Sequence, residues 1–485
     1  MEVTMSAPPD PVAGPLAPAP SVAQRLWRRF CQLAIWAFYR RCEVTGGGHL
    51  PAGPLILCAN HANALVDGLI VQASCRRIVH PLARSGLFRS PVLRPFLNLI
   101  QAVPIYRRRA GTSADPRRNE MTFARCYDYL AEGRALLIFP EGQSHSDPAL
   151  RPLKTGAARL ALGFWRRRGR LPAVVPVGLI FTHKGRFRGD VLVQYGPPVA
   201  LEPPPAGAEE RAVVAAYTAA ITAGLRAVTL NVEAWEDVAL MKEIQAFADF
   251  RRGRRRRRLS HRYRAFQRLA DAHRWLRLVH PEEVMLLRRK LRRFARLRRR
   301  YGVASYHLEL RYRPAVVARF LGRSLFFALL VFPLALWGLV MNGPAYLAAR
   351  ITTRRLARGR DQYDTAGLLS GLLYFTLFWS GQTVAVYRLF GLVPALAYAV
   401  SLPLTGAVAL LLGRERRRTI ENVRVFFLFL RQRHVRAYLL AKRQEIEVEI
   451  ARLARLVRHG VPQPRARPVT FGTDPPAPAT SRGRG

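Results

Sequence analysis

The sequence contains few cysteines, and their arrangement argues against two kinds of site. The five cysteines are odd in number, form no Cys-x-x-Cys pair and have no histidine-rich partner spacing. We therefore expect neither a disulfide framework nor a zinc or other metal site. We also expect no secretion signal, because residues 1–22 are rich in alanine and proline and have no basic stretch followed by an apolar run. We expect that segment to be disordered.

Acidic residues are scarce as well. The chain has 31 of them against 78 lysines and arginines, a formal net charge of +47. Only five of the basic residues are lysines, so 73 are arginines, and they are spread along the whole chain. A basic surface next to long apolar runs fits anionic lipid headgroups or a phosphorylated, CoA-linked substrate. We expect no nucleic acid partner, because the sequence contains no recognisable module for binding one.

The first half of the chain has the pattern of an α/β domain preceded by a helix. At 485 residues the chain is long enough for two or three structural units. Residues 23–42 combine aromatic and aliphatic side chains with flanking arginines, which is typical of an amphipathic helix at a membrane surface. The same pattern fits a helix packed on the following domain. Residues 43–230 alternate short apolar runs with helical or polar stretches, which predicts a mixed sheet flanked by helices. We expect strands at 55–59, 78–82, 102–106, 135–139, 173–180 and 190–195, and helices after Asn63 and at 117–132, 154–168 and 207–228.

The second half is predicted to be helical. Residues 231–318 form basic helices with seven arginines between 251 and 258; this run is either solvated or a contact for anionic lipid or the phosphates of CoA. Within the predicted transmembrane region 319–413, the 26 residues 324–349 carry no charge. That length crosses a bilayer core of about 30 Å. Residues 365–387 and 389–412 form two further spans or one hairpin, so we expect two to four spans. A helical cytoplasmic segment at 414–460 and a disordered tail at 461–485 follow.

Two short segments of the α/β domain suggest a base and a phosphate site. His61 follows the first predicted strand, and Asp67 lies beyond a spacer of five residues. An aspartate that fixes the tautomer of an imidazole leaves the other ring nitrogen to accept a proton from a hydroxyl. Alone, such a pair is usually a coincidence of loop residues. Further along, Arg107 and the two arginines after it end a predicted strand, where guanidinium groups suit a phosphate or simply form a surface run.

Two more segments complete the set. In Phe139-Pro140-Glu141-Gly142 an apolar strand runs into a turn, where Glu141 can accept hydrogen bonds from substrate hydroxyls and backbone amides at Gly142 can bind an anion. Lys154, just before the next helix, adds a point charge suited to a phosphate. The fourth segment, residues 175–179, is a predicted buried strand whose role is mainly shape.

The order and spacing of these four segments resemble the PlsC-like glycerolipid acyltransferase family. That family has an Asn-His-x4-Asp box, a strand ending in a phosphate-binding arginine, a Phe-Pro-Glu-Gly box and a Val-Pro-Val-type strand, and all four occur here within residues 60–179. One difference is the spacer, because five residues and not four separate His61 from Asp67. The five-residue form resembles the branch of glycerol-3-phosphate and dihydroxyacetone-phosphate acyltransferases.

The resemblance implies transfer of a fatty acyl group from acyl-CoA or acyl carrier protein to a hydroxyl of a glycerol phosphate, by direct attack and without a cofactor. His61 would be the general base and Asp67 its orienter, and the implied substrate-binding residues are Asn60, Arg107, Glu141, Gly142 and Lys154. Glycerol-3-phosphate is the expected acceptor, with dihydroxyacetone phosphate as a further one. The alternatives are an acyltransferase acting on lysophosphatidic acid and, from another class, a non-catalytic lipid-binding protein. We expect an integral membrane protein of a bacterial inner membrane, with its catalytic domain on the cytoplasmic side and in contact with anionic lipid.

Overall fold

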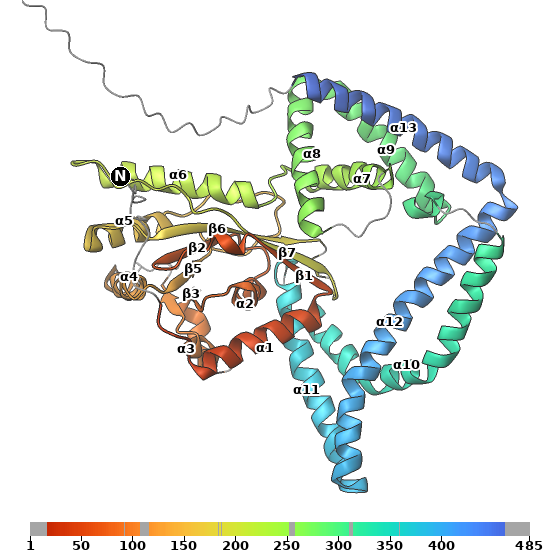
Figure 1. Ribbon diagram of the computed structural model, residues 1–485, viewed down its shortest axis with the longest axis horizontal. Helices are drawn as coiled ribbons and strands as arrows, with labels where there is room; N and C mark the ends of the chain where they lie inside the picture. Colours follow the sequence, from red (N-terminus) through yellow and green to blue (C-terminus); the bar gives the residue numbers. More distant parts are fainter. Residues whose placement is uncertain are drawn as a thin grey trace, which may run out of the picture.

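The protein consists of an α/β domain followed by a set of long helices (Figure 1). The computed structural model describes residues 17–91, 93–106, 116–182, 184–185, 187–251, 258–309, 314–357 and 359–460. Predictions for Arg107 to Arg109, for most of the arginine run at 251–258, for the tail after 460 and for most of the segment 1–22 therefore lie outside the described residues.

The α/β domain is built on one seven-stranded sheet in the order β1-β7-β6-β2-β5-β3-β4. All neighbouring strands are parallel except β6 and β7, which are antiparallel. The sheet is therefore mixed, as predicted, and all six predicted strands are present. The prediction missed β1, because its sequence RCEVT is short and only half apolar and the strand pairs solely with β7. The strands are β1 (Arg41–Thr45), β2 (Leu55–Ala59), β3 (Val79–Arg84), β4 (Val103–Ile105), β5 (Ala135–Ile138), β6 (Ala173–Phe181) and β7 (Asp190–Tyr195).

Helices cover both faces of this sheet. On one face lie α4 (Pro116–Ala131), α5 (Gly156–Arg168) and α6 (Glu210–Val228); on the other lie α1 (Val22–Phe38) and α2 (Leu65–Ser74). Strand β2 is buried along its whole length. Its side chains alternate, so that Ile56 and Cys58 join the first core and Leu55 and Leu57 join the second. A central strand covered on both faces explains why the sequence shows an unbroken apolar run there.

Helix α1 packs on the α/β domain, and its association with a membrane surface stays a prediction. Ile35 and Phe38 are buried against the domain, which confirms the packing interpretation. Leu26, Leu33 and Trp36 remain exposed on the opposite side. The short helix α3 (Arg94–Leu99) and the 3-10 helices η1 (Gly47–His49), η2 (Ser85–Arg89) and η3 (Ser305–Glu309) were not predicted, because none is long enough to show a periodic pattern.

The second half is helical, as predicted. It comprises α7 (Trp235–Arg251), α8 (Leu259–Val279), α9 (Pro281–Arg300), α10 (Pro314–Leu356), α11 (Tyr363–Phe390), α12 (Leu392–Arg431) and α13 (Arg433–Gly460). Helices α7, α8, α9 and α13 share one apolar core with η3 and the end of α12. Helices α10, α11 and α12 pack on one another, and the start of α11 reaches back to α2 of the α/β domain.

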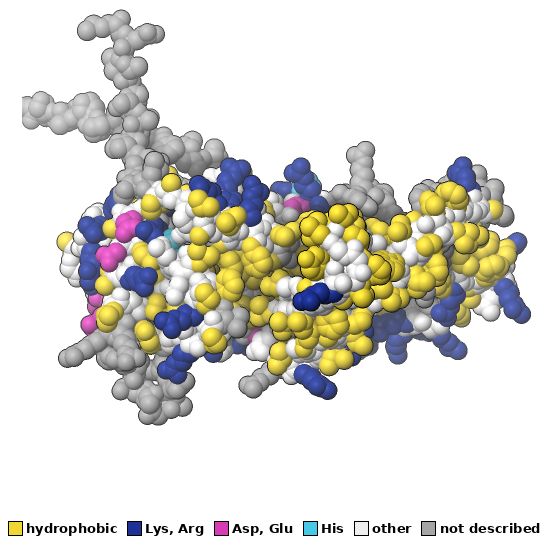
Figure 2. All heavy atoms as spheres, turned by 90° about the horizontal axis from the view of Figure 1, so that it is seen from below, with side chains coloured by type: hydrophobic (Ala, Val, Ile, Leu, Met, Phe, Trp, Pro, Cys, Tyr) yellow, Lys and Arg dark blue, Asp and Glu magenta, His cyan; other side chains and the backbone are white. Residues whose placement is uncertain are grey.

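Two segments of these long helices have the length and composition of membrane spans. They are Leu329–Leu356 in α10 and Leu392–Gly413 in α12. Most of their apolar side chains are exposed, among them Leu329, Leu339 and Leu404. Seen from below, hydrophobic side chains gather over much of the helical part (Figure 2). Membrane crossing itself stays a prediction, as does the number of spans.

Candidate active site

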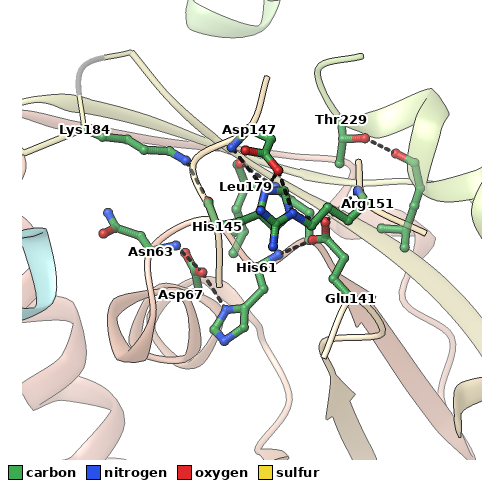
Figure 3. Close-up of polar contacts among 12 residues, drawn as sticks. His61, Asn63, Asp67, Glu141, His145, Asp147, Arg151, Leu179, Lys184 and Thr229 are labelled. Atoms are coloured by element: carbon green, nitrogen blue, oxygen red, sulfur yellow. Dashed lines mark hydrogen bonds and ion pairs between the residues drawn. The ribbon is translucent and has the colours of Figure 1, made fainter. Parts of the chain in front are cut away.

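The loop between β2 and α2 brings His61 and Asp67 together. His61 Nδ1 lies 2.9 Å from Asp67 Oδ2, and the Asp67 side chain is fully buried in the first turn of α2. A carboxylate oxygen only accepts hydrogen bonds, so Nδ1 carries the hydrogen, and in the neutral imidazole Nε2 is the nitrogen with the free lone pair. Nε2 faces away from Asp67 (Figure 3), and the His61 side chain is 19% exposed. This is the arrangement of a general base with its orienting carboxylate.

The neighbouring strand β5 fixes the plane of the imidazole. Phe139 directly follows β5, and its ring stacks on His61 with centroids 4.2 Å apart and planes 21° apart. Because β2 and β5 are parallel neighbours, their carboxyl ends meet at the same edge of the sheet. Binding sites of α/β proteins lie outside this edge.

The turn after β5 holds the backbone of His61 from both sides. Glu141 Oε1 accepts a hydrogen bond from the His61 amide at 2.7 Å, and the His145 amide donates to the His61 carbonyl at 3.1 Å. Glu141 Oε2 accepts from the Arg151 amide at 3.0 Å and from the His145 ring. The Glu141 carboxylate, predicted to contact the acceptor, thus bonds to groups of this chain, and a substrate contact stays a prediction.

Gly142 and Lys154 lie together beside that turn. Gly142 has φ +78°, and a Cβ there would come within 2.8 Å of Lys154 Cε. The Gly142 amide donates to the Phe139 carbonyl at 3.0 Å. The amide thus closes the turn, and binding of an anion or substrate at Gly142 stays a prediction. The Lys154 side chain is exposed, and its amide donates to the Pro140 carbonyl at 2.8 Å.

Asn60 ties the catalytic loop to the Val-Pro-Val strand. Its Nδ2 donates to the Leu179 carbonyl at 3.1 Å, and its Oδ1 accepts from the Leu179 amide at 2.7 Å. The side chain therefore continues the pairing of β2 with β6 by one further residue. These bonds use both polar atoms of the side chain, so Asn60, predicted to bind substrate, has a structural task here. Arg107 lies outside the described residues.

Residues far along the chain also reach this loop, and the sequence offered no signal for them. Asn63, inside the spacer, is fully buried and bonds to Asp364 and Thr365 at the start of α11. Lys184, in the β6–β7 loop, has Nζ 3.4 Å from the His145 carbonyl. Burial lowers the pKa of Lys184, and the nearby carboxylates, Asp67 foremost, oppose that shift.

Among the described residues, no group of three or more histidine, cysteine or acidic side chains is placed to hold a metal ion. The chemistry that this site offers is proton transfer by His61, which Asp67 and Glu141 hold in place by hydrogen bonds.

Comparisons with known proteins point to one family. The family model described as Acyltransferase matches residues 41–180. Glycerol-3-phosphate O-acyltransferase 2 of Saccharomyces cerevisiae is 39% identical over 85 residues, which are 17% of this chain and 11% of the yeast protein. Glycerol-3-phosphate O-acyltransferase 1 of the same yeast is 30% identical over 130 residues, 25% of this chain and 17% of that protein.

A plant protein and a solved structure are also similar. A chloroplastic 1-acyl-sn-glycerol-3-phosphate acyltransferase of Brassica napus is 27% identical over 162 residues, 33% of this chain and 42% of the plant protein. The crystal structure of the 1-acyl-sn-glycerophosphate acyltransferase PlsC from Thermotoga maritima aligns with TM-score 0.32 and 18% identity over 42% of this chain and 78% of that one. The chain spans less than half the length of each curated relative named here. The family match covers all four segments of the site, and residues 41–180 of this chain therefore belong to the PlsC-type acyltransferase family, as those segments predicted.

Proposed function

We propose that this chain is a membrane-bound acyltransferase of glycerolipid synthesis that transfers a fatty acyl group from acyl-CoA or acyl carrier protein to a hydroxyl of glycerol-3-phosphate. Dihydroxyacetone phosphate would be a further acceptor. One observation carries the proposal: His61 is held by the buried Asp67 at 2.9 Å and has its other ring nitrogen turned away from that carboxylate. The residues lie in a domain of the acyltransferase family.

In the proposed reaction His61 Nε2 takes the proton of the acceptor hydroxyl. The oxygen of that hydroxyl attacks the carbonyl carbon of the thioester at the same time. A C–O bond forms and the C–S bond breaks, and the leaving thiolate receives the proton from the imidazolium. The products are an ester and a free thiol, and the base is restored. Asp67 stabilises the imidazolium because the carboxylate and the ring are in direct contact.

The acceptor phosphate would be bound by basic side chains around the site. Arg107 follows β4 closely in the chain, and Lys154 is exposed beside the turn that holds His61. Both remain proposed phosphate ligands. Neither distinguishes glycerol-3-phosphate from lysophosphatidic acid, since the two acceptors share the phosphate group.

Two observations favour glycerol-3-phosphate as the acceptor. The two yeast relatives named as glycerol-3-phosphate acyltransferases are more similar to this chain, at 39% and 30% identity, than the plant lysophosphatidic acid type at 27%. The five-residue spacer after His61 resembles the same branch. Acylation of lysophosphatidic acid is the second candidate. A non-catalytic lipid-binding role does not need the His61–Asp67 pair, and the intact pair speaks against it.

The proposal is tested with membranes that contain the protein, labelled acyl-CoA and either acceptor. We expect transfer to glycerol-3-phosphate and a loss of about 10²- to 10⁴-fold in His61→Ala, the usual contribution of a general base. His261→Ala is the matched control, because His261 is exposed on α8. Undiminished activity in His61→Ala would contradict the mechanism. Faster acylation of lysophosphatidic acid than of glycerol-3-phosphate would show that lysophosphatidic acid is the acceptor.

The same membranes test the proposed anchoring. After a wash in alkaline carbonate, a protein with spans in α10 and α12 stays in the pellet. Release into the supernatant would exclude integral spans while leaving the proposed reaction open.

A further inference from the structure

Residues 361–365, at the start of α11 and just before it, contact the loop that carries the catalytic pair and the turn after β5. We call this segment the corner between α10 and α11. Asp364, in the first turn of α11, is 1% exposed. Its Oδ2 accepts hydrogen bonds from Asn63 Nδ2 at 2.5 Å and from the Tyr39 hydroxyl at 3.0 Å, and its Oδ1 accepts from the Gly185 amide at 2.7 Å. One carboxylate thus joins the end of α1, the catalytic loop and the β6–β7 loop. The α11 ribbon lies beside Asn63 in Figure 3.

Thr365 bonds to the same loop through its hydroxyl. Its Oγ1 donates to the Asn63 carbonyl at 2.9 Å and accepts from the Val66 amide at 3.3 Å. Asp361, slightly earlier in the corner, accepts from the Ser144 hydroxyl at 2.6 Å. Both segments that hold His61, the spacer loop and the turn after β5, are therefore in contact with the corner.

The Asn63 peptide connects these contacts to the base. The Asn63 amide donates to Asp67 Oδ2 at 2.6 Å, and this is the oxygen that faces His61 Nδ1. A shift of Asn63 would therefore move the amide that orients the Asp67 carboxylate toward His61. Thr365 holds the carbonyl of Asn63 from the other side.

Backbone strain in the spacer explains why the loop needs an external hold. Ala64 has φ 49° and ψ −128°, a conformation that residues with a Cβ rarely adopt. Such a conformation is costly and persists only where its surroundings determine it. The two groups that Thr365 contacts, the Asn63 carbonyl and the Val66 amide, lie on either side of Ala64.

We propose that Asp364 and Thr365 are positioning residues of the active site, which keep the Asn63 peptide, and through it Asp67, aligned with His61. The family match ends at residue 180, so these residues lie in a part of the chain outside the matched domain. The helical part would then complete the catalytic site as well as anchor it. This inference rests on the proposed function, because it takes His61 as the base.

Thr365→Val tests the inference, since valine keeps the shape of threonine and lacks the hydroxyl. Thr353→Val is the matched control: Thr353 is also buried, and its hydroxyl bonds only within α10 and to Ser370 of α11. Thr365→Ser restores a hydroxyl and should rescue. Acyl transfer to glycerol-3-phosphate is measured for each purified variant in detergent, per folded molecule, with thermal unfolding followed in parallel. Asp364→Asn is assayed alongside, because it turns one acceptor oxygen into a donor.

We expect Thr365→Val and Asp364→Asn to lower kcat about 10- to 100-fold, the usual effect of a small misplacement of catalytic groups. KM should change less than threefold, and Thr365→Ser should stay within threefold of the unmodified protein. Thr353→Val should lower the unfolding temperature by as much as Thr365→Val does, but its kcat should equal that of the unmodified protein. If Thr365→Val does not fold, Thr365→Ala replaces it.

Equal kcat values in Thr365→Val and Thr353→Val would overturn the inference, and so would a loss confined to KM. The two failures are separable with His61→Ala in the same assay. If His61→Ala is inactive while Thr365→Val keeps full kcat, the positioning role is wrong and the proposed function stands. If His61→Ala is fully active, the base role of His61 fails and the positioning role fails with it. If the unmodified protein transfers no acyl group to either acceptor, the proposed function itself fails.

Discussion

Acid should destabilise the α/β domain through His80, a buried histidine of β3. Its Nδ1–H donates to the Ile100 carbonyl at 2.8 Å. Burial, with Arg134 nearby, lowers the pKa of His80 to about 4 from its ordinary 6.5. The bond holds the turn that leads from α3 into β4, the strand that Arg107 follows. Protonation of His80 places a buried positive charge near Arg134, beside the turn that leads to the segment expected to carry the phosphate ligand.

The size of this effect follows from proton linkage. In the unfolded chain His80 binds a proton below about pH 6.5, while in the folded protein it stays neutral down to about pH 4. Its contribution to stability is therefore fully present above pH 6.5 and is lost as the pH falls toward 4. At pH 4.5 the loss amounts to about 2–3 kcal/mol. That is a large part of the 5–15 kcal/mol by which domains are usually stable.

His80→Asn isolates the effect, because the asparagine amide can keep a donor near the position of Nδ1 and does not titrate in this range. Urea unfolding in detergent, followed by tryptophan fluorescence at pH 7.5 and pH 4.5, gives the free energy of unfolding for both proteins. The unmodified protein should lose about 2–3 kcal/mol more than the variant between these pH values. His261→Ala, at an exposed histidine, should follow the unmodified protein. Equal losses in His80→Asn and the unmodified protein would refute the reasoning.

Two further predictions concern the catalytic pair and the long helices. Asp67→Asn should lower kcat by about 10²- to 10⁴-fold with KM little changed, because an amide cannot stabilise the imidazolium as a carboxylate does; steady-state kinetics that show only a raised KM would contradict this. Gly338→Ala should lower the unfolding temperature and destabilise the protein by about 1–3 kcal/mol, because its Cβ would lie 2.1 Å from the Thr405 carbonyl oxygen where α10 crosses α12. Gly343→Ala, with nothing within 4 Å of its Cβ, should show no such loss, and equal melting of the two would exclude this close helix contact.

The elements that were predicted from the sequence are those whose burial is visible in a short window. Strands β2 and β5 are buried on both faces, so each is an unbroken apolar run. The amphipathic and apolar helices were found for the same reason. Strand β1 and the short helix α3 escaped, because neither has enough residues to repeat a pattern and each is fixed by tertiary contacts. Strand β1 pairs with β7, which lies 149 residues further along the chain, counted from Arg41 to Asp190.

The active site likewise contains residues that short motifs reveal and residues that only tertiary contacts reveal. His61, Asp67 and Glu141 come from two short motifs, and the structure places all three in one hydrogen-bonded group. The role of Asp364 could not be predicted from the sequence. An acidic residue in the first turn of a helix is already explained by its favourable interaction with the helix dipole. Its actual partner Asn63 is 301 residues away.

The spacer of five residues connects these two levels. It places a strained Ala64 between His61 and Asp67, and it presents the Asn63 peptide both to Asp67 and to Thr365. Two bonds of the loop itself reach across Ala64 or end on it, from the Asn63 amide to Asp67 Oδ2 at 2.6 Å and from the Asp67 amide to the Ala64 carbonyl at 3.3 Å. Neither uses the Asn63 carbonyl or the Val66 amide, which flank the strained residue. The contacts of α11 supply what the loop lacks. The departure in spacing and the long C-terminal helices are therefore parts of one arrangement, in which the geometry of the base depends on a helix that begins some 300 residues later in the chain.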